Sequence, residues 1–383
     1  MSFLEKTKSF SGYDQAKLNS LVIPNMKNEQ WKYTNLERLY STPWSPSSSQ
    51  SPSERSKIDD LEILKINGAS FSSEETIASI KVRKSTEQEI EMFLSREHFY
   101  SKGFLSQLIN ASPTLYLTTE QVGKNTPVEI QFSNSSEEQI NIVLLGVVKD
   151  KQAISLRFTG KGQYHVHVWG NLKPNQCLEH VIYQELDHTS SFLFESHYNI
   201  PRDAHYRQIL VQNGALFSRH NISASLTGEN AETDLHGLYK PTEKSHVDNS
   251  AYIEHGASHT FSRQVYKGII GDEAKGIFAG IVKVNKDCLL IEAEQLNKNL
   301  LLNKKAQAYS RPQMEIDADD VKCAHGSTIG QLSEAELFYF QSRGIPKERA
   351  RAMLAEGFAM DVLLKIDNEV IRELTIKRLR GLC

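Results

Sequence analysis

Apolar and polar residues alternate along the middle of the chain. From about Pro113 onward, short segments such as 164–169 and Phe217–Leu226 alternate the two kinds of side chain and are rich in β-branched and aromatic residues. Such alternation is typical of β-strands, because successive side chains of a strand point to opposite faces. Turn sequences such as Gln212-Asn-Gly separate these segments. The pattern predicts a mainly β core over 113–330.

Two architectures fit a β core of this length. One is a sandwich or barrel, and the other is a β-solenoid in which each coil stacks only on its neighbours. A sandwich this large would be unusual as one domain. A strict hexapeptide-like repeat is absent from the sequence, so a solenoid would have to be irregular. We expect small or apolar side chains at inward positions and His, Asn, Gln and Ser at outward positions.

The regions on either side of this core have a different pattern. We expect residues 1–112 to form a mixed, partly helical region and residues 331–383 to form a helical one. In the first region, the residue patterns predict helices over 28–40 (with Trp31, Tyr33, Leu36 and Leu39 on one face), 85–94 and 103–109, a short strand over 61–66, and a Ser- and Pro-rich surface loop over 41–57.

The C-terminal region carries clear helix-boundary signals. Ser333 followed by Glu336 predicts a capping box at the start of a helix. Gly344 and Pro346 should end that helix and begin the next. Apolar stripes follow in two further helices, which could pack on the β core or form a docking surface.

Composition and charge narrow the range of possible functions. The 383 residues include 44 basic and 47 acidic side chains, for a net charge of -3, which excludes a strongly basic nucleic-acid binder. The apolar runs are far shorter than the ~20 residues that cross a bilayer, and the first residues lack an apolar signal segment. We therefore expect a cytoplasmic protein with neither nucleic acid nor membrane as a partner.

Cysteine and histidine supply the candidate metal ligands. The four cysteines are far apart and form no CxxC pair, so neither a disulfide framework nor a zinc finger is expected. His165 and His167 would share one face of a strand and could chelate a metal, with His180 downstream, as in a cupin. We favour the alternative that these histidines belong to a polar outer face.

A second pair, Cys323 and His325, also has the spacing that places two side chains on one face of a strand. Thiolate and imidazole are both good iron ligands. Alone the signal is weak, because a buried structural cysteine is an equally simple interpretation. The sequence contains no P-loop, no GxGxxG after a strand and no GxSxG elbow, so it shows no standard nucleotide-binding or hydrolase motif.

Several segments of the sequence together carry a family resemblance, namely 310–332, 337–345, 31–36, 255–269, 277–280 and 295–302. They resemble the SufB/SufD family of iron–sulfur cluster assembly proteins. Within that family, the Lys322-Cys-Ala-His-Gly segment is similar to the D-type branch rather than to the B-type branch. The resemblance implies a right-handed parallel β-helix flanked by helical N- and C-terminal regions, which favours the solenoid.

The resemblance also implies a role and partners. It implies a non-catalytic scaffold subunit that shares a transient iron–sulfur cluster with a SufB-type paralogue, with His325 as a ligand and Cys323 as a weaker candidate. It implies docking of a separate SufC-type ABC ATPase on the C-terminal helices, for which the candidate residues are Leu337, Phe338, Phe340, Leu354 and Phe358. The isolated chain should hold no tightly bound cofactor, and could form a homodimer.

Two other classes of function remain open at this point. One is a metal-dependent enzyme, either cupin-like or a β-helix enzyme, that uses His165 and His167 with His180. The other is a homodimeric partner-binding protein without any role in cluster assembly, paired through the end strand near Val321.

Overall fold

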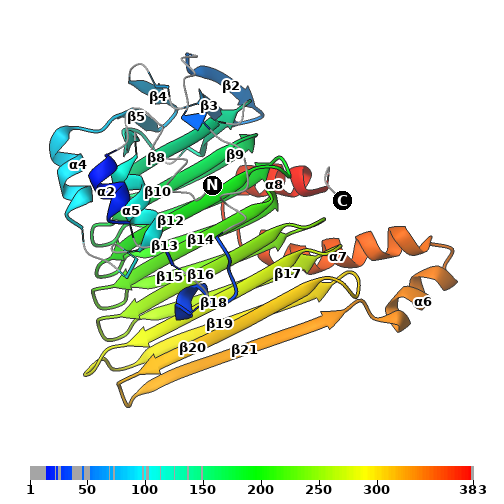
Figure 1. Ribbon diagram of the computed structural model, residues 1–383. Helices are drawn as coiled ribbons and strands as arrows, with labels where there is room; N and C mark the ends of the chain where they lie inside the picture. The colour runs from blue at the N-terminus through cyan, green and yellow to red at the C-terminus, as the bar shows by residue number, and fades with distance from the viewer. Residues whose placement is uncertain are drawn as a thin grey trace.

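Two long β-sheets dominate the computed structural model (Figure 1). The structure describes residues 14–21, 23–24, 27–36, 45–46, 52–68, 70–71, 74–96, 99–100, 103–112, 114–124, 126–135, 138–147 and 150–380. Sheet A has 11 strands in the order β20-β18-β16-β14-β12-β10-β8-β6-β5-β4, with β1 paired to β8. Sheet B has 10 strands in the order β2-β3-β7-β9-β11-β13-β15-β17-β19-β21. Each coil of the chain therefore adds one strand to each sheet.

The strands of the coils pair in parallel and in register. Sheet A contains β1 (Ser45–Pro46), β4 (Glu75–Ile77), β5 (Ile80–Lys84), β6 (Leu115–Gln121), β8 (Glu138–Val147), β10 (Gln163–Asn171), β12 (Ser191–Ile200), β14 (Phe217–Leu226), β16 (His246–His255), β18 (Lys275–Val284) and β20 (Gln307–Ile316). Sheet B contains β2 (Glu54–Ile58), β3 (Leu61–Asn67), β7 (Val128–Asn134), β9 (Lys151–Gly160), β11 (Cys177–Leu186), β13 (His205–Gly214), β15 (Glu232–Lys240), β17 (Phe261–Ile270), β19 (Ile291–Leu301) and β21 (Val321–Gln331).

The alternation along each strand divides its side chains between the interior and an outer face. On β10, Tyr164 and Val166 pack inward in the main core, whereas His167 points to the outer face. Aromatic rings stack from coil to coil inside, with Phe158 5.3 Å from Phe132 and 5.1 Å from Phe192 between ring centroids. The architecture is thus a parallel β-solenoid, which confirms the expected fold class and rules out the sandwich.

The interior is more polar than we expected from the sequence. The Gln295 amide donates to Gln264 at 2.8 Å, and the Tyr198 hydroxyl and His180 Nδ1 lie 2.6 Å apart. These side chains are buried at inward positions because the stacked coils supply hydrogen-bond partners there. Apolar side chains fill much of the interior, as predicted, but the prediction of small or apolar inward positions missed this polar part.

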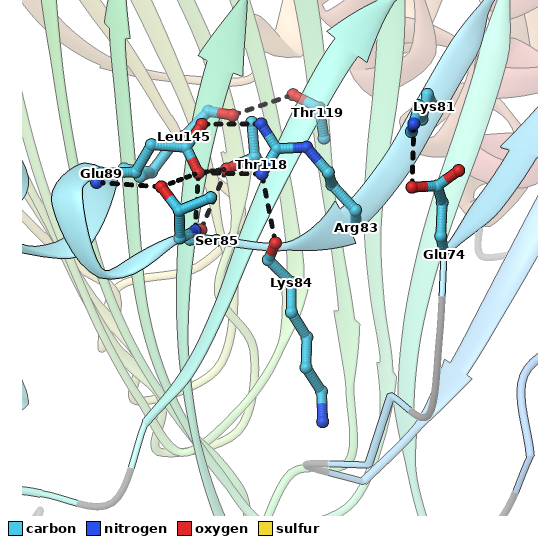
Figure 2. Close-up of polar contacts among 10 residues, drawn as sticks. Glu74, Lys81, Arg83, Lys84, Ser85, Glu89, Thr118, Thr119 and Leu145 are labelled. Carbon is cyan, nitrogen blue, oxygen red and sulfur yellow. Dashed lines mark hydrogen bonds and ion pairs between the residues drawn. The ribbon is translucent and has the colours of Figure 1, made fainter.

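The first end of the solenoid is closed by an antiparallel segment. Strand β5 pairs antiparallel with β4 and with β6, and helix α4 (Glu87–Leu94) follows with Thr86 and Glu89 forming a capping box. Figure 2 shows the polar contacts there: the Arg83 guanidinium donates to both Glu89 carboxylate oxygens at 2.8 and 2.7 Å. The hydrogen bonds from Arg83 lower the pKa of Glu89 to about 2, against the effect of burial.

The N-terminal region covers the outer face of sheet A. It contains α2 (Gln15–Asn19), η1 (Glu29–Trp31), α4 and α5 (Phe104–Ala111). Trp31, Phe93 and Phe104 form a buried cluster with Val143 and Trp169 of the sheet. Outward-facing sheet residues are therefore buried here instead of solvated.

The structure tests the predicted N-terminal elements separately. Helices α4 and α5 and strand β3 confirm the predicted helices over 85–94 and 103–109 and the predicted strand over 61–66. The helix predicted over 28–40 is wrong, because only the short 3-10 turn η1 forms, and 37–40 lie outside the described residues. Part of the predicted loop over 41–57 pairs instead as β1 and β2.

The C-terminal helices are α6 (Glu334–Ser342), α7 (Lys347–Leu363) and α8 (Glu369–Arg380). Helices α7 and α8 bury an apolar stripe, including Val362 and Leu379, against the outer face of sheet B. The Arg378 guanidinium fixes α8 to the sheet by donating to the buried Glu129 carboxylate at 2.6 and 2.8 Å. Helix α6 lies away from both sheets in Figure 1. Over the described residues, the helices are too short or too polar to cross a membrane.

Candidate site at the open end of the solenoid

The last coil of the solenoid, formed by β20 and β21, is the end layer of both sheets. No described strand pairs with the outer edge of either strand. Almost all residues of β21 are exposed or only half-buried, whereas the equivalent strands of the central coils are almost wholly buried. Inward-pointing side chains of the last coil consequently reach the surface.

Cys323 and His325 both belong to this exposed interior row. Their register partners one coil below are Ala293 and Gln295, which are buried. Cys323 is half-buried and packs against the apolar cluster that contains Ala293. Burial raises the pKa of the Cys323 thiol, although a backbone hydrogen bond at Ala293 acts in the opposite direction. His325 is exposed at the open end.

Apolar side chains surround the two candidate ligands. Ile316 on β20 is 40% exposed and Ile329 on β21 is 49% exposed. Ile316 is the register partner of the fully buried Val284, so it continues an interior row into solvent. Exposed apolar rows next to unpaired strand edges are typical of a surface that another chain covers.

The donor set of this end suits iron but is incomplete. One sulfur and one imidazole are a chemically suitable pair for iron, and each iron of a cluster needs further ligands from sulfide or protein. Among the described residues, no group of three or more His, Cys, Asp or Glu side chains is arranged to hold a metal ion. Any cluster at this end would need additional ligands.

The alternative histidine site does not form. His165 and His167 are fully buried on the outer face of sheet A, where His167 contacts Phe93 of the N-terminal region. His180 points into the solenoid, where it contacts Tyr198, so the three imidazoles do not converge. Burial lowers the pKa of both His165 and His180 to about 3, which keeps them neutral.

Our interpretation of these histidines as a polar outer face was therefore only half correct. His165 and His167 do face outward from the solenoid, but the N-terminal region covers them. The sequence contains no signal that assigns this region to that face.

The five predicted docking residues are in different environments. Phe338 is 71% exposed on α6, whereas its neighbour Leu337 is buried. Phe340 and Leu354 are half-buried. Phe358 packs toward the solenoid, where the Lys267 ammonium lies 4.3 Å from its ring centroid.

One exposed aromatic residue was missed. Tyr339 is 55% exposed beside Phe338, and the Arg343 guanidinium lies 3.9 Å from its ring centroid. The consecutive aromatic residues Phe338 and Tyr339 were the available signal, because two neighbours on a helix cannot both face a single core.

Comparisons with known proteins identify the family to which the chain is similar. The family model described as "SUF system FeS cluster assembly, SufBD core domain" matches residues 146–358. The chain is 32% identical over 186 residues to the iron-sulfur cluster assembly protein SufD of Escherichia coli, covering 46% of this chain and 44% of that protein. It is 31% identical over 232 residues to Protein ABCI7, chloroplastic, of Arabidopsis thaliana, covering 59% of this chain and 49% of that protein. The chain spans less than half the length of these relatives.

Proposed function

The chain belongs to the SufBD family of the SUF iron–sulfur cluster assembly system, and on this basis we propose that it is a non-catalytic scaffold subunit that presents ligands for a nascent cluster at the open end of its solenoid. The cluster is cargo, built and then passed on. The observation that carries the proposal is the last coil, where His325 and Cys323 lie in one uncovered interior row.

His325 is the first candidate ligand and Cys323 the second. His325 is exposed at the open end, so its imidazole can reach a metal bound beyond the last coil. Cys323 is partly held in an apolar cluster, and its raised pKa disfavours the thiolate that binds iron. The remaining ligands would come from sulfide and from a SufB-type paralogue that covers the open end.

The C-terminal helices are the proposed docking site of a SufC-type ABC ATPase. Phe338 is the best placed of the predicted residues, because it is the most exposed of them and lies on α6, away from the sheets. Tyr339 extends this surface. Leu337 and Phe358 contribute indirectly, since their side chains pack within the chain.

Cluster reconstitution on the assembled complex tests the ligand role. The chain would be co-expressed with matching SufB- and SufC-type proteins, purified, and supplied anaerobically with iron and sulfide. His325→Ala should form the complex but lose most of its cluster absorbance. His188→Ala is the matched control, because His188 is exposed on a turn away from the last coil. Full cluster recovery on His325→Ala would contradict the proposal.

Co-purification tests the docking surface separately. Phe338→Asp should weaken retention of the ATPase while leaving the SufB-type partner bound, because α6 and the open end are different surfaces. Met92→Asp places the same charge at an exposed apolar position on α4, in the N-terminal region on sheet A. Equal ATPase retention in both variants would show that α6 is not the docking site.

A further inference from the structure

A polar pocket of about 210 Å³ lies on the outer face of sheet B, far along the chain from the last coil. It is bounded by the first residues of three neighbouring strands and by the start of α8. Its lining includes Lys151, Cys177, His205, Arg207 and Asn368. Cys177 is one of the free cysteines among the described residues and is half-buried.

Two basic side chains flank the Cys177 sulfur across the sheet. Lys151 on β9 and His205 on β13 are both register partners of Cys177, one on each side. Residues paired in register on neighbouring strands present their side chains to the same face, close together. Cys177 therefore lies between a lysine and a histidine on one face of the sheet.

The Asp234 carboxylate orients the His205 imidazole. The Nε2 atom of His205 lies 3.1 Å from Oδ2 of Asp234, which is 6% exposed and also accepts from Arg207 at 3.1 Å. The second Asp234 oxygen has no hydrogen-bond partner among the described residues. Burial opposes charge on His205, but its hydrogen bonds with Asp234 and Cys177 outweigh this and raise its pKa to about 9. His205 is consequently an imidazolium at neutral pH.

Most charges near the pocket have a structural task. The Glu179 carboxylate accepts from the backbone N–H groups of Asp367 and Asn368 at 2.7 and 3.1 Å, which fixes the start of α8. Arg207 pairs with Asp367 as well as with Asp234. This task does not involve Cys177 or Lys151, which line the pocket without contributing to the attachment of α8.

We propose that Cys177 is a thiol–disulfide exchange site for small anionic disulfides, in which His205 stabilises the reacting sulfur and Lys151 binds a carboxylate of the reagent. The Cys177 sulfur attacks one sulfur of the disulfide, the original S–S bond breaks, and a mixed disulfide forms. The proton that Cys177 loses ends, through solvent, on the departing thiolate. The disulfide is the oxidant, and no other co-reactant is needed. Partly exposed cysteines beside cationic groups are typical of reactive thiols.

The isolated full-length chain can test this without any partner or cluster. It would be treated with a limiting amount of oxidised glutathione, and the mixed disulfides at Cys177 and Cys323 would be quantified by peptide mass spectrometry. Cys323 serves as an internal reference that is also half-buried. We expect Cys177 to react at least about tenfold faster than Cys323. Similar rates at the two cysteines would overturn the proposal.

Two variants separate this chemistry from a structural effect. His205→Gln should slow Cys177 by about tenfold and leave Cys323 unchanged, whereas unfolding would speed both. Asp234→Asn gives a second test, because it should slow Cys177 in the same direction through His205. Unchanged Cys177 rates in both folded variants would overturn the role of His205.

The reagent class is tested with Lys151→Gln. This variant should slow the reaction with anionic glutathione disulfide more than the reaction with neutral hydroxyethyl disulfide. Equal slowing with both reagents would overturn the assignment to anionic disulfides. Since no step involves His325, failure here would leave the proposed cluster site unaffected.

Discussion

The two ends of the solenoid are built from the same repeating coil but finish differently. At the first end, antiparallel strands β5 and β4 extend sheet A beyond β6, and Phe71, Ile77 and Ile80 add buried side chains to the interior there. At the other end, β20 and β21 leave Ile316 and Ile329 exposed. A solenoid coil is complete only when another layer covers it. The difference therefore indicates which end is left for a partner.

The side chains at inward positions also differ between the closed coils and the last coil. Closed coils contain stacked aromatic rings such as Phe132, Phe158 and Phe192. The last coil instead places Cys323 and His325 at inward positions, in register with Ala293 and Gln295. Contacts on both sides stabilise an inner coil, whereas the last coil has them on one side only. Substitutions should accordingly cost less toward the open end.

The largest effect is expected in the closed coils. Phe158→Ala should lower the free energy of unfolding by about 4 kcal/mol, because it removes a fully buried ring and leaves a cavity between stacked neighbours. Urea-induced unfolding followed by circular dichroism measures this. A loss below about 1 kcal/mol would mean that the inner coils are not tightly packed.

The second-largest loss of stability is expected when the buried ion pair beneath the N-terminal region is broken. Asp248 pairs with Arg219 and accepts from Thr34, and the Arg219 guanidinium lies 4.4 Å from the ring centroid of Trp31. Asp248→Asn should cost about 3 kcal/mol in unfolding free energy, because it leaves a buried guanidinium without its counter-charge. Asp319→Asn, at an exposed turn of the open end, should cost less than about 0.5 kcal/mol. Similar costs would contradict the burial of this network.

The capping box of helix α4 at the closed end contributes to the stability of the fold in a pH-dependent way. Because the folded pKa of Glu89, about 2, lies below its ordinary value of 4.5, ionised Glu89 stabilises the fold above pH 4.5. This contribution is lost as the pH falls toward 2. Glu89→Gln should therefore cost about 2 kcal/mol at neutral pH.

Unfolding of Glu89→Gln and wild type would be compared between neutral and acidic pH. The difference between them should shrink as the pH approaches 2. Glu87→Gln, exposed in the same helical turn, serves as the matched control. A difference that stays constant with pH would show that the Arg83 contact does not depend on ionised Glu89.

Two pairs of residues show what the sequence could and could not predict. His165 and His167 have the same i, i+2 spacing as Cys323 and His325, and in both pairs the strand places the side chains on one face, as predicted. Spacing along a strand determines the face but not what covers it. His167 is buried by Phe93 and Arg96, which lie far away in the sequence and have no pattern that assigns them there.

The same limit applies to the strands and helices, whose local patterns could be predicted from the sequence but whose packing could not. Strands of the core and the helix beginning after Ser333 were predictable, because alternation and capping are local signals. The helix expected over 28–40 was wrong because Trp31 and Leu36 pack on sheet A from a turn and a loop, and do so without helical spacing. Their apolar character reflected tertiary packing, which a local periodicity cannot identify.

The smallest effect on stability, and the sharpest test of the comparison, is expected at Ile329. Ile329→Glu should change the unfolding free energy of the isolated chain by less than about 0.5 kcal/mol, because the side chain is half exposed on an end strand. If a SufB-type partner covers this end, the same change should sharply reduce the yield of co-purified complex, since it would bury an unpaired charge. Ile58→Glu is the matched control, with 40% exposure on the edge strand β2 of the opposite end. Complex yield should be preserved in that variant, and an equal loss in both would mean that the open end is not the pairing surface.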